Sequence, residues 1–150
     1  MLIKKATKIN AQNLTDLTFR SKAHWGYSPE QLEIWKDDLT ITADHIIENK
    51  FYVLLDEVKI IGYYSWSKNG DVSIELNNLF VDPPFIGQGF GEMLMQDFLK
   101  RINELGIKKV QLFSEPQVEN FYSRFGFKTI GQHQSSIKDR FLPIMELKLQ

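Results

Sequence analysis

The sequence predicts an α+β fold of three layers: a mixed, mostly antiparallel sheet of about seven strands, flanked by about four helices, in a single domain over residues 1–150. Three observations predict this class. Three apolar runs follow one another with short turns between them, and Asn69-Gly70 in the second turn is a strong hairpin signal. A long helical pattern then leads to a further strand, which must run parallel to the strand before the helix. Alternating apolar residues from Phe141 to Leu149 close the sheet.

Caps and periodicity place the individual elements. The expected strands lie at 2–8, 51–55, 59–68, 71–81, 109–114, 127–134 and 141–149. The expected helices lie at 10–23, from Ser28 through Leu39, at 89–105 and at 116–124, with one or two further helical turns at 43–49. Ser28 marks a clear helix start, because it is an N-cap residue followed by proline at the first helical position. We expect Leu32, Trp35 and Leu39 to share one face of that helix.

Composition excludes several classes of function. The chain has no cysteine, which excludes a disulfide framework, thiolate zinc sites and a cysteine nucleophile. The net charge of −1 gives no general attraction for nucleic acid. The sequence also lacks an apolar run long enough to span a membrane, and its first residues lack the apolar core of a signal peptide. We therefore expect a cytoplasmic protein without nucleic-acid or membrane partners.

The stretch from Val81 to Leu94 predicts a binding site for phosphate oxygens. After two prolines, Gly87, Gly89 and Gly91 open a long helix, and glycine lets a ligand approach the backbone closely. The unpaired N–H groups of the first helical turn and the helix dipole favour anions. The spacing differs from the Gly-x-Gly-x-x-Gly of dinucleotide-binding folds, and no Gly-Lys-Ser/Thr follows as in a P-loop. The alternative is that the glycines only form a turn.

The segment from Ser21 to Tyr27 gathers His24, Trp25 and Tyr27 around a glycine. One interpretation is core packing, since Trp and Tyr bury large areas when their polar atoms find partners. The other is the rim of a substrate pocket. The sequence does not decide between them.

Two motifs in this order resemble the GNAT superfamily of acyl-CoA-dependent N-acyltransferases. Ile86-Gly87-Gln88-Gly89-Phe90-Gly91, preceded by Val81-x-Pro83, is similar to the family's pyrophosphate loop, Arg/Gln-x-x-Gly-x-Gly/Ala. Phe121-Tyr122-Ser123-Arg124-Phe125-Gly126-Phe127 is similar to its later Phe-Tyr-x-x-x-Gly-Phe motif. The resemblance covers nearly the whole chain, and the segments 20–27 and 140–147 look like those of an uncharacterised bacterial subgroup.

The resemblance implies acetyl-CoA as co-substrate, no metal, and a central parallel strand pair that splays apart to admit the pantetheine arm. The cofactor-binding residues that it implies are Phe80, Val81, Ile86, Gly87, Gln88, Gly89, Phe90, Gly91 and Asn120. Ile86 departs from the family pattern, which has Arg or Gln there, so a cation aimed at the pyrophosphate is lost. Because backbone amides make the family's main phosphate contacts, we expect CoA binding to persist. The main chain of Phe80 and Val81 is expected to pair with the pantetheine arm, whereas Asn120 is equally consistent with a polar surface residue.

Acyl transfer by direct amine attack needs a base, a donor to the oxyanion and an acid for the leaving thiolate. The resemblance implies Tyr122 as the acid, and a core aromatic is the alternative. Glu75, on the strand that leads to the loop, is the candidate base, and a solvated charge on the sheet face is the alternative. Strand alternation is expected to place Glu75, Asn77, Leu79 and Val81 on one face. The backbone N–H of Val81 or its neighbour is the expected oxyanion donor.

The predicted function is transfer of an acetyl group from acetyl-CoA to a primary amine of a small molecule or peptide, by direct attack in a ternary complex. The candidate acceptor contacts are His24, Trp25, Tyr27 and Asn77. Ile86 motivates an alternative, a non-catalytic CoA-binding sensor or interaction domain that keeps the fold. The C-terminal strand and the exposed-looking aromatics are compatible with a homodimer.

Overall fold

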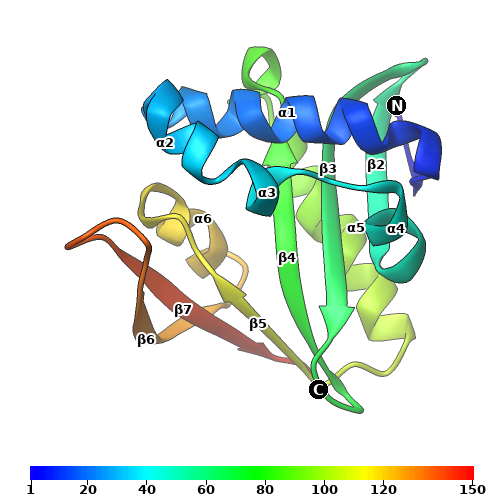
Figure 1. Ribbon diagram of the computed structural model, residues 1–150. Helices are drawn as coiled ribbons and strands as arrows, with labels where there is room; N and C mark the ends of the chain where they lie inside the picture. The colour runs from blue at the N-terminus through cyan, green and yellow to red at the C-terminus, as the bar shows by residue number, and fades with distance from the viewer. The chain divides into compact units, whose positions relative to one another are not determined.

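A computed structural model describes residues 1–150 (Figure 1). Its helices are α1 (Ala11–His24), α2 (Pro29–Ile34), α3 (Lys36–Leu39), α4 (Ala43–Glu48), α5 (Phe90–Glu104) and α6 (Glu119–Ser123). Its strands are β1 (Leu2–Lys5), β2 (Lys50–Asp56), β3 (Lys59–Lys68), β4 (Ser73–Val81), β5 (Lys109–Phe113), β6 (Lys128–Gln134) and β7 (Phe141–Lys148). Single 3₁₀ turns are η1 (Lys8–Asn10), η2 (Pro83–Phe85) and η3 (Pro116–Val118). The elements follow the predicted order, with six helices in place of about four.

The strands form one hydrogen-bonded sheet in the order β1-β2-β3-β4-β5-β7-β6. β4 and β5 run parallel, whereas the pairs β1–β2, β2–β3, β5–β7 and β6–β7 are antiparallel. This confirms the predicted mixed α+β fold. The parallel ladder extends only from Ser73 beside Lys109 to Glu75 beside Gln111, although β4 continues to Val81.

The last strand is not where the sequence places it. We expected β7 to close the sheet, but it lies between β5 and β6, so β6 is the outer strand. The reason is the hairpin: β6 and β7 pair from Lys128 beside Glu146 to Gln134 beside Phe141, and the returning strand reaches β5. The edge of β7 is therefore already paired and offers no edge for a dimer contact.

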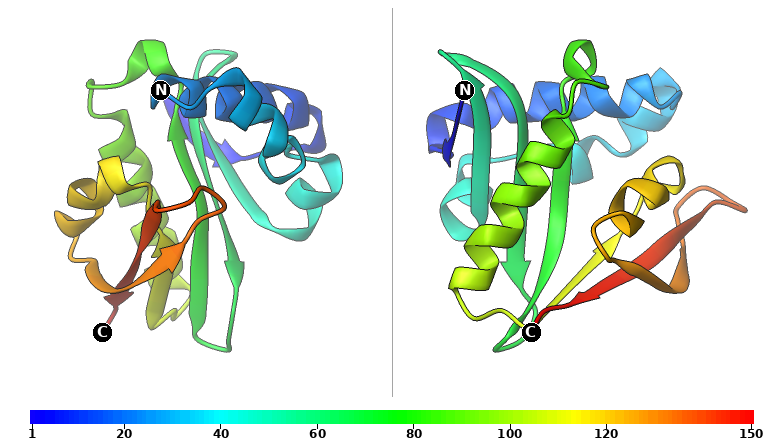
Figure 2. Two further views of the ribbon diagram at one scale, coloured as in Figure 1. Left: turned by 60° about the vertical axis from the view of Figure 1, so that its left-hand side comes forward. Right: turned by 180° about the vertical axis from the view of Figure 1, so that it is seen from behind.

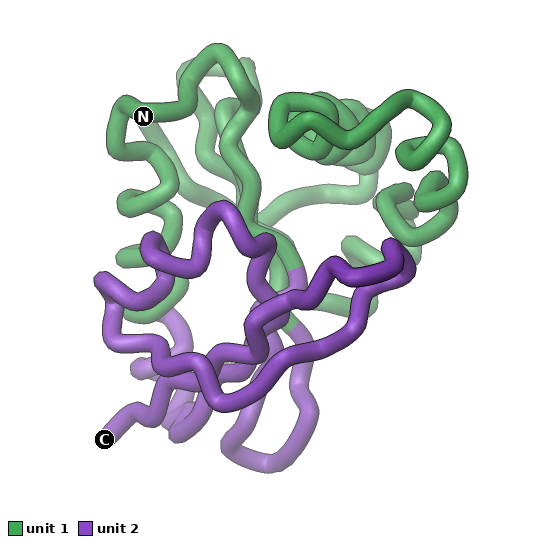
Figure 3. The backbone as a smooth tube through the Cα atoms, turned by 90° about the vertical axis from the view of Figure 1, so that its left-hand side faces the viewer, with its two compact units in different colours: residues 1–66, 78–100 green, residues 67–77, 101–150 purple.

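The chain divides into two compact units, which Figure 3 distinguishes by colour. Unit 1 comprises residues 1–66 and 78–100, and unit 2 comprises residues 67–77 and 101–150. None of the helices combines the length and the apolar character that crossing a membrane requires.

In unit 1, helices cover both faces of the sheet. α1 crosses one face of β2 and β3, and α5 lies on the opposite face (Figures 1 and 2). On the α1 side, Leu14 and Leu17 join a buried cluster with Phe51, Val53 and Tyr63 of the strands. Burial of such side chains stabilises the fold by about 1.5–3 kcal/mol each.

The α1 helix also buries hydroxyl groups, which its apolar periodicity does not predict. Thr15 donates to the carbonyl of Ala11 and accepts from the backbone N–H of Ile41. The Thr18 hydroxyl donates to the carbonyl of Leu14 and shares a hydrogen bond with the Tyr63 phenol. These bonds offset the cost of placing polar groups in the core.

On the α5 side, β3 approaches β4 and the helix closely at Gly62. A Cβ at this position would lie 2.7 Å from the carbonyl oxygen of Phe80 and 3.0 Å from Leu94 Cδ1, so only glycine fits. Two residues further on, the Tyr64 phenol donates to Asp97 of α5 at 2.7 Å. Glycine thus sets the spacing and tyrosine fixes the helix.

In unit 2, buried side chains lie on the paired strands β5 and β7. Val110, Leu112 and Met145 are fully buried, and the Leu112–Met145 pair stands side by side in the antiparallel ladder. Arg140 and Glu115 form an ion pair at 2.6 Å, with both side chains largely buried. The pair anchors the residue before β7 to the segment that follows β5.

Two predicted helices are each divided. The Ser28 cap is confirmed, since its side chain accepts from the backbone N–H of Gln31, but α2 ends at Ile34 and α3 starts at Lys36. Trp35, at φ −88° and ψ 3°, caps both, so one continuous apolar face does not form. Residues 116–124 likewise form η3 followed by α6.

Candidate active site

In unit 1, the end of β4 leads into a glycine-bearing turn that opens α5. The backbone N–H of Asp82 donates to the carbonyl of Ile61 at 2.8 Å, which holds the turn to β3. The two prolines then form η2, because proline fixes φ and lacks an N–H for the ladder. The sheet therefore ends at Val81.

Gly87 and Gly89 have φ of 85° and 84°, a backbone conformation that glycine adopts without strain. No atom lies within 4 Å of a Cβ built on either residue, so the backbone there is open. α5 starts at Phe90, with Gly91 in its first turn, and the N–H groups of that turn have no intrahelical partners. This arrangement suits an anion with several oxygens.

The side chains of the turn contribute no charge. Ile86 is 38% exposed, at the position where the family pattern has Arg or Gln. Gln88 Nε2 lies 3.4 Å from the carbonyl oxygen of Pro84 and so folds back on its own turn. An anion at this turn would therefore meet backbone amides and the α5 dipole, without a cationic side chain of the turn.

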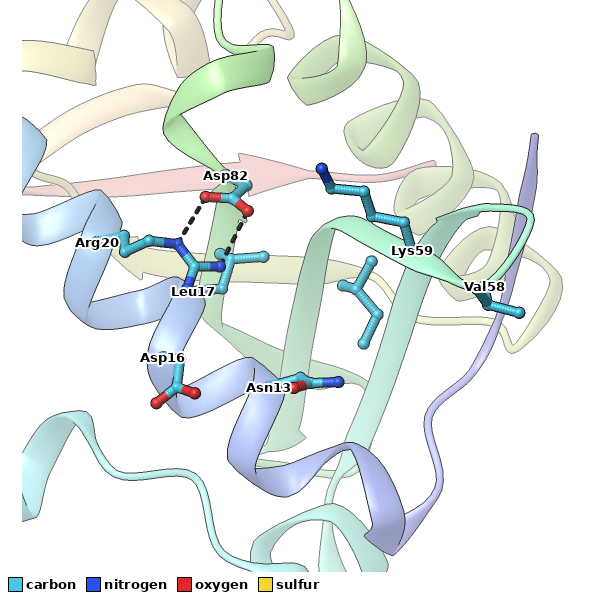
Figure 4. Close-up of a pocket in the computed structure, with 8 residues that line it drawn as sticks. Asn13, Asp16, Leu17, Arg20, Val58, Lys59 and Asp82 are labelled. Carbon is cyan, nitrogen blue, oxygen red and sulfur yellow. Dashed lines mark hydrogen bonds and ion pairs between the residues drawn. The ribbon is translucent and has the colours of Figure 1, made fainter.

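Helix α1 is fixed to the end of β4 by two consecutive residues. Arg20 Nε and Nη2 each lie 2.9 Å from an oxygen of Asp82, as the dashed lines of Figure 4 show. The next residue, Ser21, donates to the carbonyl of Val81 at 3.1 Å. The guanidinium of Arg20 has its pKa raised by the hydrogen bond to Asp82. These contacts hold α1 against the end of β4 and the start of the turn.

A cavity of about 220 Å³ lies beside this ion pair (Figure 4). Its lining residues are Asn13, Asp16, Leu17, Arg20, Val58, Lys59, Ile60 and Asp82. Lys59 Nζ also lies 4.9 Å from the ring centroid of Phe85, which ties the start of β3 to η2.

Three aromatic rings lie within about 6 Å of one ammonium group near the end of β4. Lys22 Nζ lies 5.8 Å from the ring centroid of Tyr27, 5.6 Å from Trp35 and 5.9 Å from Phe80. The Tyr27 and Trp35 rings meet edge to face, with centroids 4.9 Å apart and planes at 74°. We refer to Tyr27, Trp35 and Phe80 as the aromatic cage.

In unit 2, Tyr122 lies in α6 and is buried, at 8% exposure. Its ring packs edge to face against Phe121 and Phe127, with centroids 5.2 and 5.8 Å away. Burial, and secondarily the charge of Glu115, raises the pKa of the Tyr122 phenol. The phenol therefore stays protonated at neutral pH, as a general acid must.

Glu75 lies within the parallel ladder of unit 2, beside Gln111 of β5. Its side chain is half-buried, and desolvation raises the pKa of its carboxyl group above the ordinary value of 4.5. A carboxylate whose pKa moves toward neutral becomes a better base at physiological pH.

The predicted alternation along β4 is interrupted. Asn77 Nδ2 donates to Ser67 at 2.9 Å, and Ser65 donates to Asn78 Oδ1 at 2.6 Å. Ser65 and Ser67 are two residues apart on β3 and share a face, so the consecutive residues Asn77 and Asn78 must share one too. This is the pattern of a β-bulge.

The bulge corrects one prediction. Glu75 and Asn77 lie on the same side of β4, but Leu79 and Val81 do not follow them, because the extra residue reverses the alternation. Phe80 takes their place, and its ring packs on Tyr63 with centroids 5.9 Å apart.

The remaining predicted site residues are mostly exposed to solvent. His24 is exposed at the end of α1 and meets Trp25 edge to face at 5.3 Å. Asn77 is exposed apart from its bond to Ser67. Asn120 is exposed near the start of α6. The turn and the cage thus belong to unit 1, whereas Glu75, Asn77, Asn120 and Tyr122 belong to unit 2.

Residues 26–149 match the family model of the acetyltransferase (GNAT) domain. The chain belongs to the GNAT family. The match spans the glycine turn, α5 and the segment of Tyr122.

Curated relatives support this GNAT assignment. The chain is 30% identical over 94 residues, 63% of its length, to the uncharacterized N-acetyltransferase ycf52 of Gracilaria tenuistipitata var. liui. It is 32% identical over 83 residues, 52% of its length, to the uncharacterized N-acetyltransferase YhbS of Escherichia coli. The matched segments cover 52% and 48% of these relatives, so the chain spans about half the length of the curated relatives that it matches.

Solved structures share the GNAT fold. The PaiA N-acetyltransferase of Thermoplasma acidophilum, in complex with coenzyme A, aligns over 99% of this chain and 98% of its own, with a TM-score of 0.79 and 21% identity. YncA of Salmonella typhimurium, a putative acetyltransferase solved with acetyl-CoA, aligns over 100% of this chain and 94% of its own, with a TM-score of 0.71 and 20% identity.

Sequence reasoning does not find four residues that make tertiary contacts around α1 and the end of β4. Arg20 and Asp82 are 62 positions apart, and nothing local signals their pairing. Lys22 fits an ordinary helix surface and Trp35 fits the apolar face that it is expected to share with Leu32 and Leu39, so only the tertiary fold brings the lysine to the rings. The aromatic content of the segment after α1 was the one available signal.

Proposed function

We propose that this GNAT domain transfers an acetyl group from acetyl-CoA to a primary amine of a small molecule or peptide, by direct attack in a ternary complex. The observation that carries the proposal is the open turn with left-handed Gly87 and Gly89 at the start of α5. The structures of PaiA and YncA, which hold coenzyme A and acetyl-CoA, support the choice of cofactor.

The turn residues fit a CoA pyrophosphate. The amides of residues 87–91 would bind the phosphate oxygens, and the dipole of α5 would stabilise their charge. The main chain of Phe80 and Val81 would pair with the pantetheine arm as an added strand does. Ile86 leaves this recognition without a cationic side chain, so affinity for CoA rests on the backbone. The thioester supplies the activated acetyl group.

Two residues of unit 2 would act as the general base and the general acid of the reaction. Glu75, with its raised pKa, would accept the proton that the amine loses as its nitrogen attacks the thioester carbonyl. The backbone N–H of Val81 or its neighbour would donate to the oxyanion. When the carbon–sulfur bond breaks, Tyr122, held protonated by burial, would return a proton to the thiolate. The products are an amide and free CoA, and exchange with solvent then removes the proton from Glu75 and restores that of Tyr122, which closes the proton balance.

The acceptor is proposed to bind beside α1 and the segment that follows it. Tyr27 is half-buried and has a place in the aromatic cage, which favours it over His24 as an acceptor contact. Trp25 and Asn77 stay candidates for contact with the acceptor. A homodimer stays a proposal as well, with no contact through the edge of β7.

The test is amine-dependent release of the CoA thiol from acetyl-CoA, with the amide product identified by mass spectrometry. A broad panel of primary amines and lysine peptides is required, because the proposal does not specify the identity of the acceptor. The account predicts thiol release with a subset of the panel and none without amine. A thermal shift run in parallel reports binding, since ligand at about 100 times its Kd adds about 2.7 kcal/mol of stability. A shift without thiol release would favour the non-catalytic CoA-binding module instead.

A further inference from the structure

The aromatic cage has the chemistry of a site for organic cations. Rings attract a cation through their quadrupole when it lies within about 6 Å of the centroid, and three rings here do so for Lys22 at once. The rings come from three elements: the segment after α1, the α2–α3 junction and β4. The cage residues and Lys22 are all half-buried, so the site remains reachable from solvent.

Its surroundings favour positive charge. The segment 29–39, which carries Trp35, has four exposed carboxylates against one lysine. The carboxylates are Glu30, Glu33, Asp37 and Asp38. Clustered charge of one sign raises the local concentration of oppositely charged ligands and speeds their association.

The cage also adjoins the proposed acetyl-transfer site. Phe80 directly precedes Val81, whose carbonyl accepts from Ser21, and Lys22 is the next residue of α1. A ligand that replaces the Lys22 ammonium would therefore lie beside Phe80, which belongs to the segment assigned to the pantetheine arm.

The chemistry of acetylation decides which nitrogen the cage would hold. The nitrogen that attacks the thioester must be neutral, because it needs a free electron pair. Aromatic rings around an ammonium group stabilise the charged form and oppose its deprotonation. The caged nitrogen and the acetylated nitrogen must therefore be different atoms.

We propose that the aromatic cage binds a second, cationic nitrogen of the acceptor, and that the ammonium of Lys22 is the resident occupant that the acceptor displaces. The acceptor class is then an amine that carries another ammonium group on the same molecule. This inference rests on the proposed function for its acceptor, whereas the cage itself is a binding site that can be tested without acetyl transfer.

The first experiment titrates the protein with choline and with 3,3-dimethylbutan-1-ol, which has the same shape without the charge, by calorimetry. Choline has no N–H and cannot be acetylated, so this arm is independent of activity. We expect choline to bind the Lys22→Met variant at least about fivefold more tightly than the wild type, and the neutral alcohol to bind neither. Lys100→Met, an exposed lysine of α5, is the matched control and should leave choline affinity unchanged.

Two outcomes would overturn the cage. If Lys22→Met lowers only the melting temperature and leaves choline affinity unchanged, the lysine is a structural tie between α1, the α2–α3 junction and β4. If choline and the alcohol bind alike, the rings form an ordinary apolar surface. Should Lys22→Met fail to fold, Trp35→Leu in the wild-type background gives the same decision, because it should lower choline affinity about tenfold.

The second experiment measures kcat/KM for a diamine and for the monoamine of equal chain length. Trp35→Leu should lower kcat/KM for the diamine about tenfold more than it lowers kcat/KM for the monoamine. Equal losses for both would contradict the assignment of the cage to a second nitrogen. Absence of turnover with either amine, together with choline binding, would remove the proposed function and retain the cage.

Discussion

One guanidinium, that of Arg20, donates to both carboxylate oxygens of Asp82, at 2.9 Å each. The two side chains differ in environment: that of Arg20 is 52% exposed and that of Asp82 only 8%. The pair therefore holds a buried charge at the residue that follows β4, and it fixes α1 to the turn that leads to α5.

Removing Arg20 should leave the buried carboxylate of Asp82 without its cation. We expect Arg20→Met to lower the free energy of unfolding by about 1–2 kcal/mol, less than for a fully buried pair because Arg20 is half-exposed. Urea denaturation measures the change. The double variant Arg20→Met/Asp82→Asn should lose less than the sum of the two single variants. Strict additivity would show that the pair contributes nothing.

Replacing Gly62 should push β3 away from β4 and α5. Its Cβ would lie 2.7 Å from the carbonyl oxygen of Phe80, so we expect Gly62→Ala to destabilise the protein by about 1–3 kcal/mol. Gly131→Ala is the matched control, because it too lies in a strand and its Cβ would meet Ile144 at an ordinary 3.6 Å. Equal melting temperatures for the two variants would refute the close packing at Gly62.

The pH dependence of activity should reflect Glu75. Desolvation raises the pKa of this carboxyl group, and a base acts only when ionised, so kcat/KM should fall as the pH drops through a value above 4.5. Ionisation of Glu75 should have the opposite effect on the free energy of unfolding. Because the folded-state pKa is raised, ionisation costs stability as the pH rises through it, so Glu75→Gln should be more stable than the wild type at neutral pH. Its turnover should nevertheless be about 10²-fold lower.

A pH–rate profile combined with denaturation at two pH values checks both statements. Wild-type turnover in Glu75→Gln would remove the carboxylate as base. A stability difference that does not change between acidic and neutral pH would contradict the raised pKa.

Loss of the Tyr122 hydroxyl should affect chemistry rather than binding. Tyr122→Phe keeps the ring that packs on Phe121 and Phe127, and it removes the proton intended for the leaving thiolate. We expect kcat to fall by about 10²-fold with the KM for acetyl-CoA unchanged. Steady-state kinetics decide it, and an unchanged kcat would leave Tyr122 as a core aromatic.

The sequence predicts those features that depend on local chemistry. The Ser28 cap and the glycine turn before α5 follow from backbone preferences of single residues, and the structure has both of them. The fold class follows from the order of such elements. The split of the helix at Trp35 is a local change of about 45° in ψ from the helical value, which the sequence pattern does not encode.

Features that depend on tertiary contacts are not predictable in this way. The bulge at Asn77 and Asn78 has no local signal, because only the hydroxyls of β3 reveal that two consecutive residues share a face. The position of β7 is set by its pairing with β5, which competes with the sequence expectation of an edge strand. The approach of Lys22 to Trp35 arises from the packing of α1 beside the α2–α3 junction.

The most direct test of the account is a calorimetric titration of acetyl-CoA into the wild type, Gly89→Ala and Gly106→Ala. Both glycines have positive φ, 84° and 75°, and open space around a Cβ, so both substitutions carry a similar backbone cost of about 1–2 kcal/mol. Only Gly89 belongs to the turn proposed to bind the pyrophosphate. The account predicts that the wild type and Gly106→Ala bind equally and that Gly89→Ala binds at least about tenfold more weakly. Equal affinity in all three, or no binding by the wild type, would contradict it.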